Sequence, residues 1–164
     1  YSRAKEVVFD TPPDFVVERN FSIPAKTLLE YVTNLTYRNF LLKGVDIFDY
    51  NENEVTRLGT EHVCVINNKH FYFEAVKKKV KSGKYVYGEK TTNIPVADTF
   101  YQFYTFSPIS EDSSILKVEL YWETRSLLKK ILMTLFGKRV LVKNTKNSLN
   151  LLFKFSEERG AMPT

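Results

Sequence analysis

The amino-acid sequence predicts an α+β fold in which a seven-stranded, curved antiparallel sheet wraps around a long C-terminal helix. Three features lead to this prediction. Apolar residues alternate at period two over most of 45–124, helical spacing returns after this region, and short turn-forming segments divide it. At 164 residues the chain has the usual length of one domain, so we expect a single domain over 1–164.

The N-terminal part predicts one strand and two short helices. A polar lead-in covers 1–13. Phe15 to Ile23 then alternates apolar and polar residues, which is typical of a half-buried strand. An apolar stripe from Leu28 to Leu35 indicates the first helix, and a second helical stretch around Tyr37 to Leu42 ends before Gly44.

Six further strands are predicted in the region of alternation. Turn-forming pairs such as Asn67-Asn68 and Ser82-Gly83 separate them. Loops of two to six residues are too short for the crossover that parallel neighbours need, so successive strands are expected to pair antiparallel. The predicted strands are Val45 to Tyr50, Gly59 to Ile66, His70 to Val80, Lys84 to Thr92, Thr99 to Ser107 and Ile115 to Thr124.

The C-terminal part predicts two helical pieces separated by Gly137. The first is an amphipathic segment over 126–136, in which leucines oppose Lys129 and Lys130. The second is a long helix over 138–158, with apolar and small residues recurring at three- and four-residue steps. Because the apolar face of a sheet needs a partner, we expect this helix to lie across the concave side.

Composition argues against several function classes. Two histidines and one cysteine give no spacing like that of a zinc site, and the six glycines are not clustered into a phosphate-binding loop. We therefore expect no metal and no cofactor. The pI of about 9.2 and the many aromatics would suit a binder of single-stranded nucleic acid. We expect no nucleic-acid partner, because the long helix must cover the aromatic face of the sheet.

Three features of the sequence bear on location and membrane contact. Cys64 is the single cysteine, so no intramolecular disulfide can form, which suits a reducing, cytoplasmic location. No apolar run is long enough to span a bilayer. The basic amphipathic stretch 126–139 suits either contact with an anionic membrane or packing against the body of the protein. Of the two, we favour packing against the body and keep membrane contact as the alternative.

The order of the predicted elements and four local sequences carry a resemblance to a known superfamily. The sequences are Ile23-Pro24-Ala25 before the first helix, Gly44-Val45, Gly59-Thr60, and Ser148 to Leu152 in the last helix. From about Phe15 to Glu158 the chain resembles the helix-grip superfamily, which contains START lipid-transfer domains, the birch-pollen allergen group, polyketide cyclases and activators of chaperone ATPases. The resemblance implies a cavity between sheet and helix, which relatives use for lipids, sterols, plant hormones or aromatic polyketides.

Two further sequences resemble one branch of this superfamily. Arg57 to Thr60 and Tyr87-Gly88-Glu89 are similar to a bacterial branch in which a nucleotide-cyclase-like domain precedes the helix-grip domain. The chain begins at Tyr1 and not at Met. We therefore expect a larger parent protein with a preceding domain.

The alternation also predicts which residues face the long helix. This inward set is large, aromatic and sparsely polar, as in a small-molecule pocket, although a tightly filled aromatic core has the same profile. A register error of one residue would exchange the whole set for its neighbours. The candidate ligand-binding residues are His62, Cys64, Phe71, Phe73, Tyr87, Glu89, Gln102, Tyr104 and Trp122 from the sheet, and Asn144, Ser148 and Leu152 from the helix.

Three functional hypotheses follow. The leading one is binding of an apolar or aromatic, lipid-like small molecule, as a carrier or sensor domain. The first alternative is an enzyme of the polyketide cyclase or dehydratase type, in which Tyr87, Glu89 or His62 moves protons. The second is a protein-interaction module resembling the chaperone-ATPase activators, with its interior filled by its own side chains. We favour binding over catalysis, because no nucleophile and base are placed to meet: His62 and Cys64 share a strand face and point in parallel.

Overall fold

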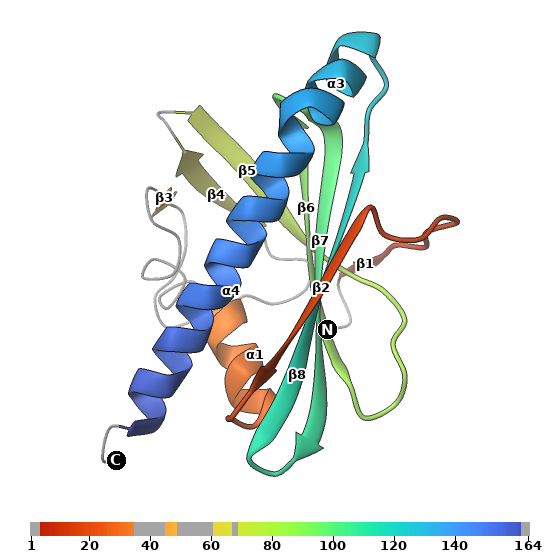
Figure 1. Cartoon of the computed structure of the whole chain (residues 1–164). Helices are drawn as coiled ribbons and strands as arrows, with labels where there is room; N and C mark the ends of the chain where they lie inside the picture. Colours follow the sequence, from red (N-terminus) through yellow and green to blue (C-terminus); the bar gives the residue numbers. More distant parts are fainter. Residues whose placement is uncertain (1–3, 35–44, 49–60, 67–68, 162–164) are drawn as a thin grey trace.

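The structure is a computed structural model that describes residues 4–34, 45–48, 61–66 and 69–161; of 45–48, 61–66, 69–72 and 160–161 it describes the backbone. A curved sheet lies behind the long helix α4 (Lys138–Ala161), and α1 (Ala25–Thr33) packs beside the lower half of that helix (Figure 1). Hydrogen-bonded neighbours in the sheet follow the order β2 (Phe15–Phe21), β8 (Ser113–Glu123), β7 (Ala97–Ser110), β6 (Tyr85–Ile94), β5 (Lys69–Lys77), β4 (Glu61–Ile66) and β3 (Val45–Phe48).

The strands along this path are antiparallel and follow the predicted order, with shifted ends. The sheet as a whole is mixed, however, because β1 (Lys5–Glu6) pairs in parallel with β5. The prediction of a purely antiparallel, seven-stranded sheet is therefore confirmed in part. Of the two predicted short helices, the first corresponds to α1, and the second, around 37–42, lies outside the described residues.

The predicted break at Gly137 is wrong. Helix α3 (Leu127–Leu132) continues through a π-helical turn, η1 (Met133–Gly137), directly into α4. Ser126 begins this run, because its hydroxyl accepts a hydrogen bond from the Lys129 backbone N–H at 3.2 Å. Gly137 is buried, and a Cβ added to it would lie 2.8 Å from Cβ of Val96. This glycine therefore permits close packing and does not end the helix.

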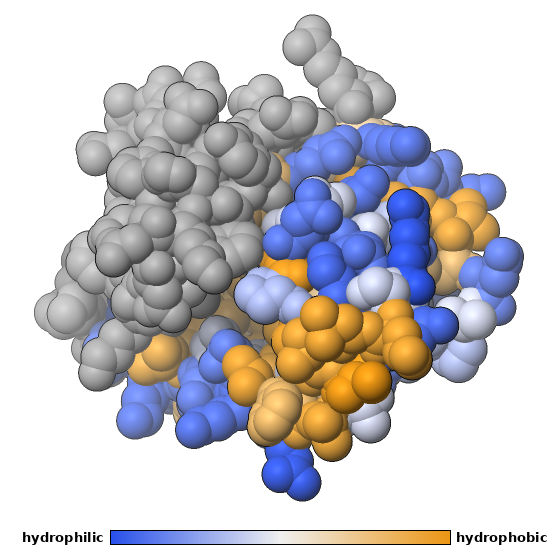
Figure 2. Space-filling model, turned by 90° about the horizontal axis from the view of Figure 1, so that it is seen from above, coloured by the Kyte–Doolittle hydropathy of each residue, from blue (hydrophilic) through white to orange (hydrophobic). Residues whose placement is uncertain are grey.

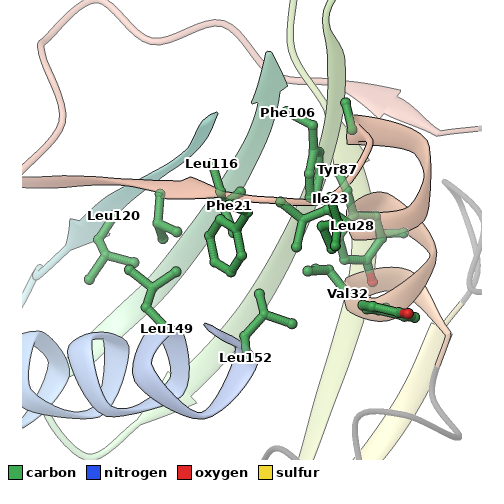
Figure 3. Packing of buried hydrophobic residues seen from close by; sticks show 14 of the residues in the cluster. Phe21, Ile23, Leu28, Val32, Tyr87, Phe106, Leu116, Leu120, Leu149 and Leu152 are labelled. Atoms are coloured by element: carbon green, nitrogen blue, oxygen red, sulfur yellow. The ribbon is translucent and has the colours of Figure 1, made fainter. Parts of the chain in front are cut away.

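The main hydrophobic core lies between the concave face of the sheet and the two helices α1 and α4. Alternate residues of β2, β7 and β8 point into it, as period-two patterning requires. In Figure 3, Leu149 and Leu152 project from α4 towards these strands, and Leu28 and Val32 project from α1. The buried members with the least exposure include Phe21, Leu28, Tyr87, Phe106, Leu116, Val118 and Leu120.

Helix α4 is anchored through its C-terminal half. Leu149 and Leu152 are each 4 % exposed, and the Phe153 ring lies 5.8 Å from that of Phe21. Arg19 of β2 donates a hydrogen bond to Asn150, and its guanidinium lies 4.2 Å above the ring of Phe153. The cation that interrupts the apolar face of β2 therefore has a structural role, because Arg19 holds α4 against the edge of the sheet.

A second core covers the convex face of the sheet. It is built on Tyr101, Phe103 and Tyr121, and the segment that the sequence predicted as a polar lead-in packs over it. The Phe9 ring stacks on Tyr121 with centroids 3.7 Å apart and meets Tyr101 and Phe103 edge-on. The Val7 backbone N–H donates to the Lys77 carbonyl oxygen at 2.8 Å. This segment therefore belongs to the fold.

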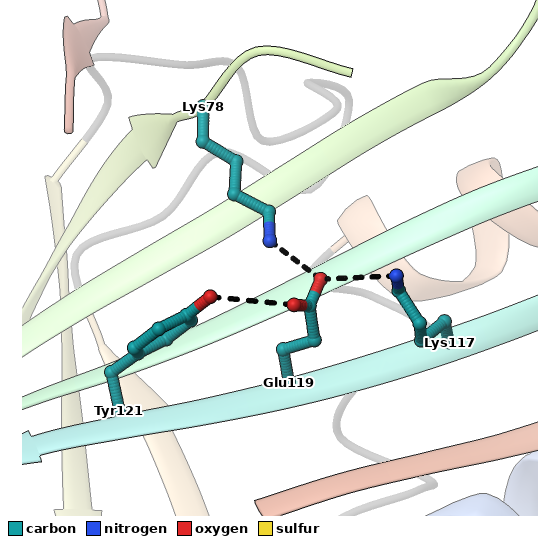
Figure 4. Close-up of polar contacts among 4 residues, drawn as sticks. All are labelled: Lys78, Lys117, Glu119 and Tyr121. Atoms are coloured by element: carbon teal, nitrogen blue, oxygen red, sulfur yellow. Dashed lines mark hydrogen bonds and ion pairs between the residues drawn. The ribbon is translucent and has the colours of Figure 1, made fainter. Parts of the chain in front are cut away.

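A carboxylate is enclosed beside the second core (Figure 4). Lys78 Nζ lies 2.5 Å from Glu119 Oε1, Lys117 Nζ lies 3.7 Å from the same oxygen, and the Tyr121 hydroxyl donates to Oε2 at 3.3 Å. A glutamate that alternates with apolar residues along a strand normally faces solvent. The Glu119 side chain does lie on the convex face, but it is buried, with 6 % of the residue exposed.

The Tyr121 hydroxyl should titrate far above its ordinary range. Burial, followed by the neighbouring Glu119 carboxylate, raises the pKa of Tyr121 from 10.0 to about 12. Because the folded-state pKa is raised, the contribution to stability is fully present below pH 10 and is lost as the pH rises towards 12. We expect Tyr121→Phe to make the fall in the free energy of unfolding across this window shallower. Urea unfolding at several alkaline pH values measures this.

Part of the fall should remain in that variant, since burial also raises the pKa of Tyr101. A slope that is the same with and without the Tyr121 hydroxyl would contradict the prediction.

Candidate ligand-binding site

The register of β5 to β8 brings several predicted site residues into rows on the concave face. Glu89 of β6 pairs with Gln102 of β7, which in turn pairs with Leu120 of β8. In the next row, Tyr87 pairs with Tyr104. The inward orientation predicted for these residues is confirmed, because their strand faces pack against the main core.

Two tyrosines in these rows make matching hydrogen bonds along their own strands. The Tyr87 hydroxyl donates to Glu89 Oε1 at 2.8 Å, and the Tyr104 hydroxyl donates to Gln102 Oε1 at 3.1 Å. Because β6 and β7 run antiparallel, the two pairs lie side by side, with the tyrosine rings stacked at 6.3 Å. The carboxyl group of Glu89 and the amide group of Gln102 therefore lie next to each other among aromatic side chains.

Exposure divides these two pairs. Tyr87 and Glu89 are each 2 % exposed, so their hydrogen bond lies within the core. Gln102 and Tyr104 are half-buried, as are Phe73 of β5 and Trp122 of β8. The concave face thus keeps aromatic and amide groups that are partly accessible to solvent, although α4 lies across it.

The N-terminal half of α4 packs loosely in comparison with its C-terminal half. No residue from 138 to 148 is buried, whereas Leu149, Leu152 and Ser156 further along are. The side chains of Leu141, Thr145 and Ser148 lie on one side of the helix at three- and four-residue steps and are half-buried. The Thr145 hydroxyl donates to the Leu141 carbonyl oxygen at 2.8 Å, which satisfies it within its own helix.

Four of the predicted site residues are not placed with this group. Asn144 is exposed, so the prediction that it faces inward is wrong. One residue of helix turns the side chain by about 100°, and the inward positions are taken by its neighbours. The backbone register pairs His62 with Phe73 and Cys64 with Phe71 on β4 and β5. The side chains of His62, Cys64 and Phe71 lie outside the described residues.

Other predicted and unpredicted features complete the site. Leu152 is buried in the main core, and Ser148 is half-buried one turn earlier on the helix. Sequence reasoning missed Arg19 as the residue that holds α4 in place. Its signal was visible: Arg19 occupies an inward position between Val17 and Phe21, where a cation needs a partner.

The described part of the chain holds neither a cluster of metal ligands nor a helix that could span a membrane. No group of three or more His, Cys, Asp and Glu side chains is gathered there as metal ligands would be. Of the helices in these residues, none is long and apolar enough to cross a membrane.

Comparison with known proteins gives matches to solved structures. No protein-family model and no curated protein matches the chain. A START superfamily protein from Mycobacterium smegmatis is 14% identical, with a TM-score of 0.63 over 88% of this chain and 97% of that one. Norcoclaurine synthase from Thalictrum flavum, in complex with dopamine and hydroxybenzaldehyde, is 10% identical, with a TM-score of 0.62 over 92% and 88%.

A third match is the di-domain ARO/CYC protein BexL from the BE-7585A biosynthetic pathway. It is 10% identical, with a TM-score of 0.64 over 85% of this chain and 45% of that one. Together with the sheet and helix described above, these likenesses show that the chain has the helix-grip fold. The resemblance predicted from the sequence is thereby confirmed for the fold. At sequence identities this low, structural similarity shows the fold but not the function, which has to be argued from the site itself.

Proposed function

We propose that the chain binds an apolar or aromatic small molecule between the concave face of the sheet and the N-terminal half of α4, as a carrier or sensor domain. One observation carries this proposal: Gln102, Tyr104 and Trp122 stay partly accessible beneath a helix whose nearer half buries no residue. A core filled by its own side chains would seal these residues, as it seals Leu116 and Leu120 at 0 % exposure. An aromatic surface with few polar groups is the usual lining of a small-molecule site.

The polar groups suggest what one end of the ligand offers. The Tyr104 hydroxyl uses its proton on Gln102 Oε1, so the tyrosine oxygen accepts and the Gln102 amide NH₂ donates. Ser148 can add a hydroxyl from the helix side. We therefore infer an amphiphilic ligand, apolar or aromatic over most of its length, with a hydroxyl or carbonyl at one end. Norcoclaurine synthase, which has the same fold, is known in complex with two aromatic compounds, dopamine and hydroxybenzaldehyde.

Binding can be tested with an environment-sensitive fatty-acid probe and with the protein's own fluorescence. Trp122 is the single tryptophan of the chain and lies on the concave face, so its emission reports on this interior directly. We expect probe binding together with a shift in tryptophan emission. Ser148→Phe, which fills the space between helix and sheet, should weaken binding by at least about tenfold.

A neighbouring substitution controls for this variant. Asn147 is exposed one residue before Ser148, so Asn147→Phe adds the same ring on the outside of the helix and should leave the probe affinity unchanged. Native mass spectrometry of the purified protein should detect a retained apolar compound. A protein that retains nothing and binds no probe would exclude the proposal, and equal loss in both variants would place the probe elsewhere.

The enzyme alternative draws on one observation, the buried hydrogen bond between Tyr87 and Glu89. A carboxyl and a phenol within 2.8 Å are a suitable pair for moving a proton. Both groups are sealed in the core, however, so a substrate would have to open it to reach them. Turnover of an aromatic polyketide that is lost in Glu89→Gln, with binding retained, would support catalysis over carriage.

A cytoplasmic location remains a prediction from the single cysteine.

A further inference from the structure

A row of large apolar side chains is exposed where α3 leads into α4. Among the described residues, ten large hydrophobic side chains are exposed, and six of them fall within 127–140. Single exposed hydrophobic residues are ordinary, but a group on one helical run calls for a partner. This group, called here the α3 patch, consists of Leu127 (73 %), Leu128 (66 %), Ile131 (46 %), Leu135 (55 %), Phe136 (61 %) and Val140 (52 %).

Helical geometry gathers these residues on one side of the run. Met133 and Gly137 are buried four residues apart and mark the side that faces the body, where Val96 packs against Gly137. The patch residues recur at three- and four-residue steps away from that side. Figure 2 views the molecule from the end at which α3 lies and shows hydrophobic surface gathered beside hydrophilic residues.

The segment that carries the patch bears charge of a single sign. The 33 residues from 124 to 156 contain eight Lys and Arg and no Asp or Glu, whereas the rest of the chain has 16 basic and 19 acidic residues. The net positive charge of the protein therefore comes from this segment. Lys129 is paired with Asp98 at 3.2 Å, while Lys130, Lys138 and Arg139 are exposed beside the patch.

We propose that the α3 patch docks the chain onto the surface of an anionic lipid bilayer. Exposed Leu, Ile and Phe side chains enter the boundary between headgroups and acyl chains, and flanking Lys and Arg side chains meet the lipid phosphates and carboxylates. The absence of acidic residues in 124–156 removes the repulsion that such a surface would otherwise exert. Acidic protein partners and a second copy of the chain are the competing occupants that the test must separate.

The place of the patch gives this docking a consequence. It leads directly into the half of α4 that buries no residue, over the partly accessible concave face. A bilayer held at the patch therefore lies next to the end of the proposed binding site that is closed least tightly. The evidence for docking is the exposure of the patch and the charge beside it. The docking proposal is therefore independent of whether the chain binds a ligand.

The test is co-sedimentation of the whole chain with lipid vesicles. We expect binding to phosphatidylcholine vesicles that contain about 30% phosphatidylserine, much weaker binding to phosphatidylcholine alone, and release by salt. Leu135→Ser with Phe136→Ser removes two patch side chains, and Lys138→Glu with Arg139→Glu reverses two flanking charges. Each pair should weaken binding on the order of tenfold or more.

Matched pairs elsewhere on the surface serve as controls. Val8 and Ile109 are exposed apolar residues outside the patch, at 80 % and 55 %, and Lys81 and Lys84 are exposed cations on a turn. The pairs Val8→Ser with Ile109→Ser and Lys81→Glu with Lys84→Glu should bind vesicles as the original protein does. Circular dichroism and thermal unfolding verify that every variant is folded.

Several outcomes would overturn the proposal. They are no binding to either vesicle, equal losses in control and patch pairs, and a dimer in sedimentation velocity that Leu135→Ser with Phe136→Ser dissociates. Binding of the fatty-acid probe is measured separately without vesicles, and the patch pairs should leave it unchanged. Failure of docking and failure of ligand binding are thus read from different experiments.

Discussion

A Gly88→Val variant is expected to lose about 3 kcal/mol of its free energy of unfolding. Gly88 of β6 pairs with Phe103 of β7 on one side and with Val76 of β5 on the other. A Cβ added to Gly88 would lie 2.5 Å from Cε1 of Phe103 and 2.9 Å from the Val76 carbonyl oxygen. The Phe103 ring cannot give way easily, because Phe9 packs edge-on against it.

Urea unfolding measures this loss, and another glycine provides the control. Gly83 has a φ of +86° at a turn and nothing within 4 Å of an added Cβ, so Gly83→Ala meets backbone strain alone and should cost about 1 kcal/mol. Replacing the Phe103 ring with a smaller side chain should also relieve its clash with a Cβ at position 88. Gly88→Ala combined with Phe103→Leu is therefore expected to be less destabilised than the sum of the two single variants. A Gly88→Val variant as stable as the original protein would show that the ring is free to move.

The inward register of the central strands could be predicted from the sequence. Burial on one face imposes period two on β6, β7 and β8, and a slip by one residue would have exchanged the core for its neighbours. Tyr87, Gln102, Tyr104 and Trp122 therefore lie where the alternation placed them. The long helix followed from the same logic, since its spacing changes from two to three and four residues.

The cover of the convex face could not be predicted in the same way. Val7 and Phe9 carry the right alternation, but β1 has two residues and its partner β5 lies some 70 residues later in the chain. No local pattern reveals a partner at that separation. The helix break predicted at Gly137 was wrong for another reason. Glycine commonly follows the end of a helix, whereas here the absence of a side chain makes room for Val96.

The candidate site shows where sequence reasoning ends. Alternation indicates which residues point inward, but their exposure depends on how closely α4 approaches the sheet. Tyr87 and Tyr104 occupy the same row, yet one is sealed and the other is half-buried. Asn144 differs from Thr145 by one position, and this small rotation decides between solvent and interior. The roles of His62, Cys64 and Phe71 stay predictions.

The carboxylate of Glu119 should depend strongly on Lys78. Its side chain is 8 % exposed, and Lys78 Nζ supplies the closest positive charge at 2.5 Å while lying 5.2 Å from the Phe103 ring centroid. Lys78→Met keeps most of the apolar stem but removes that charge. A buried carboxylate that loses its partner typically costs 3–5 kcal/mol; because Lys78 is itself 17 % exposed, we expect a loss of about 2–3 kcal/mol in urea unfolding.

Two comparisons separate the ion pair from general damage to the convex face. Lys117 lies 3.7 Å from the same carboxylate and is 38 % exposed, so Lys117→Met should cost less than about 1 kcal/mol. Lys78→Met combined with Glu119→Leu removes both charges, and an apolar pair beside Phe103 and Tyr121 should recover most of the lost stability. If the double variant is less stable than Lys78→Met, the enclosed carboxylate has a structural role that its charge partner does not explain, and the Tyr121 hydroxyl that donates to it becomes the next group to remove.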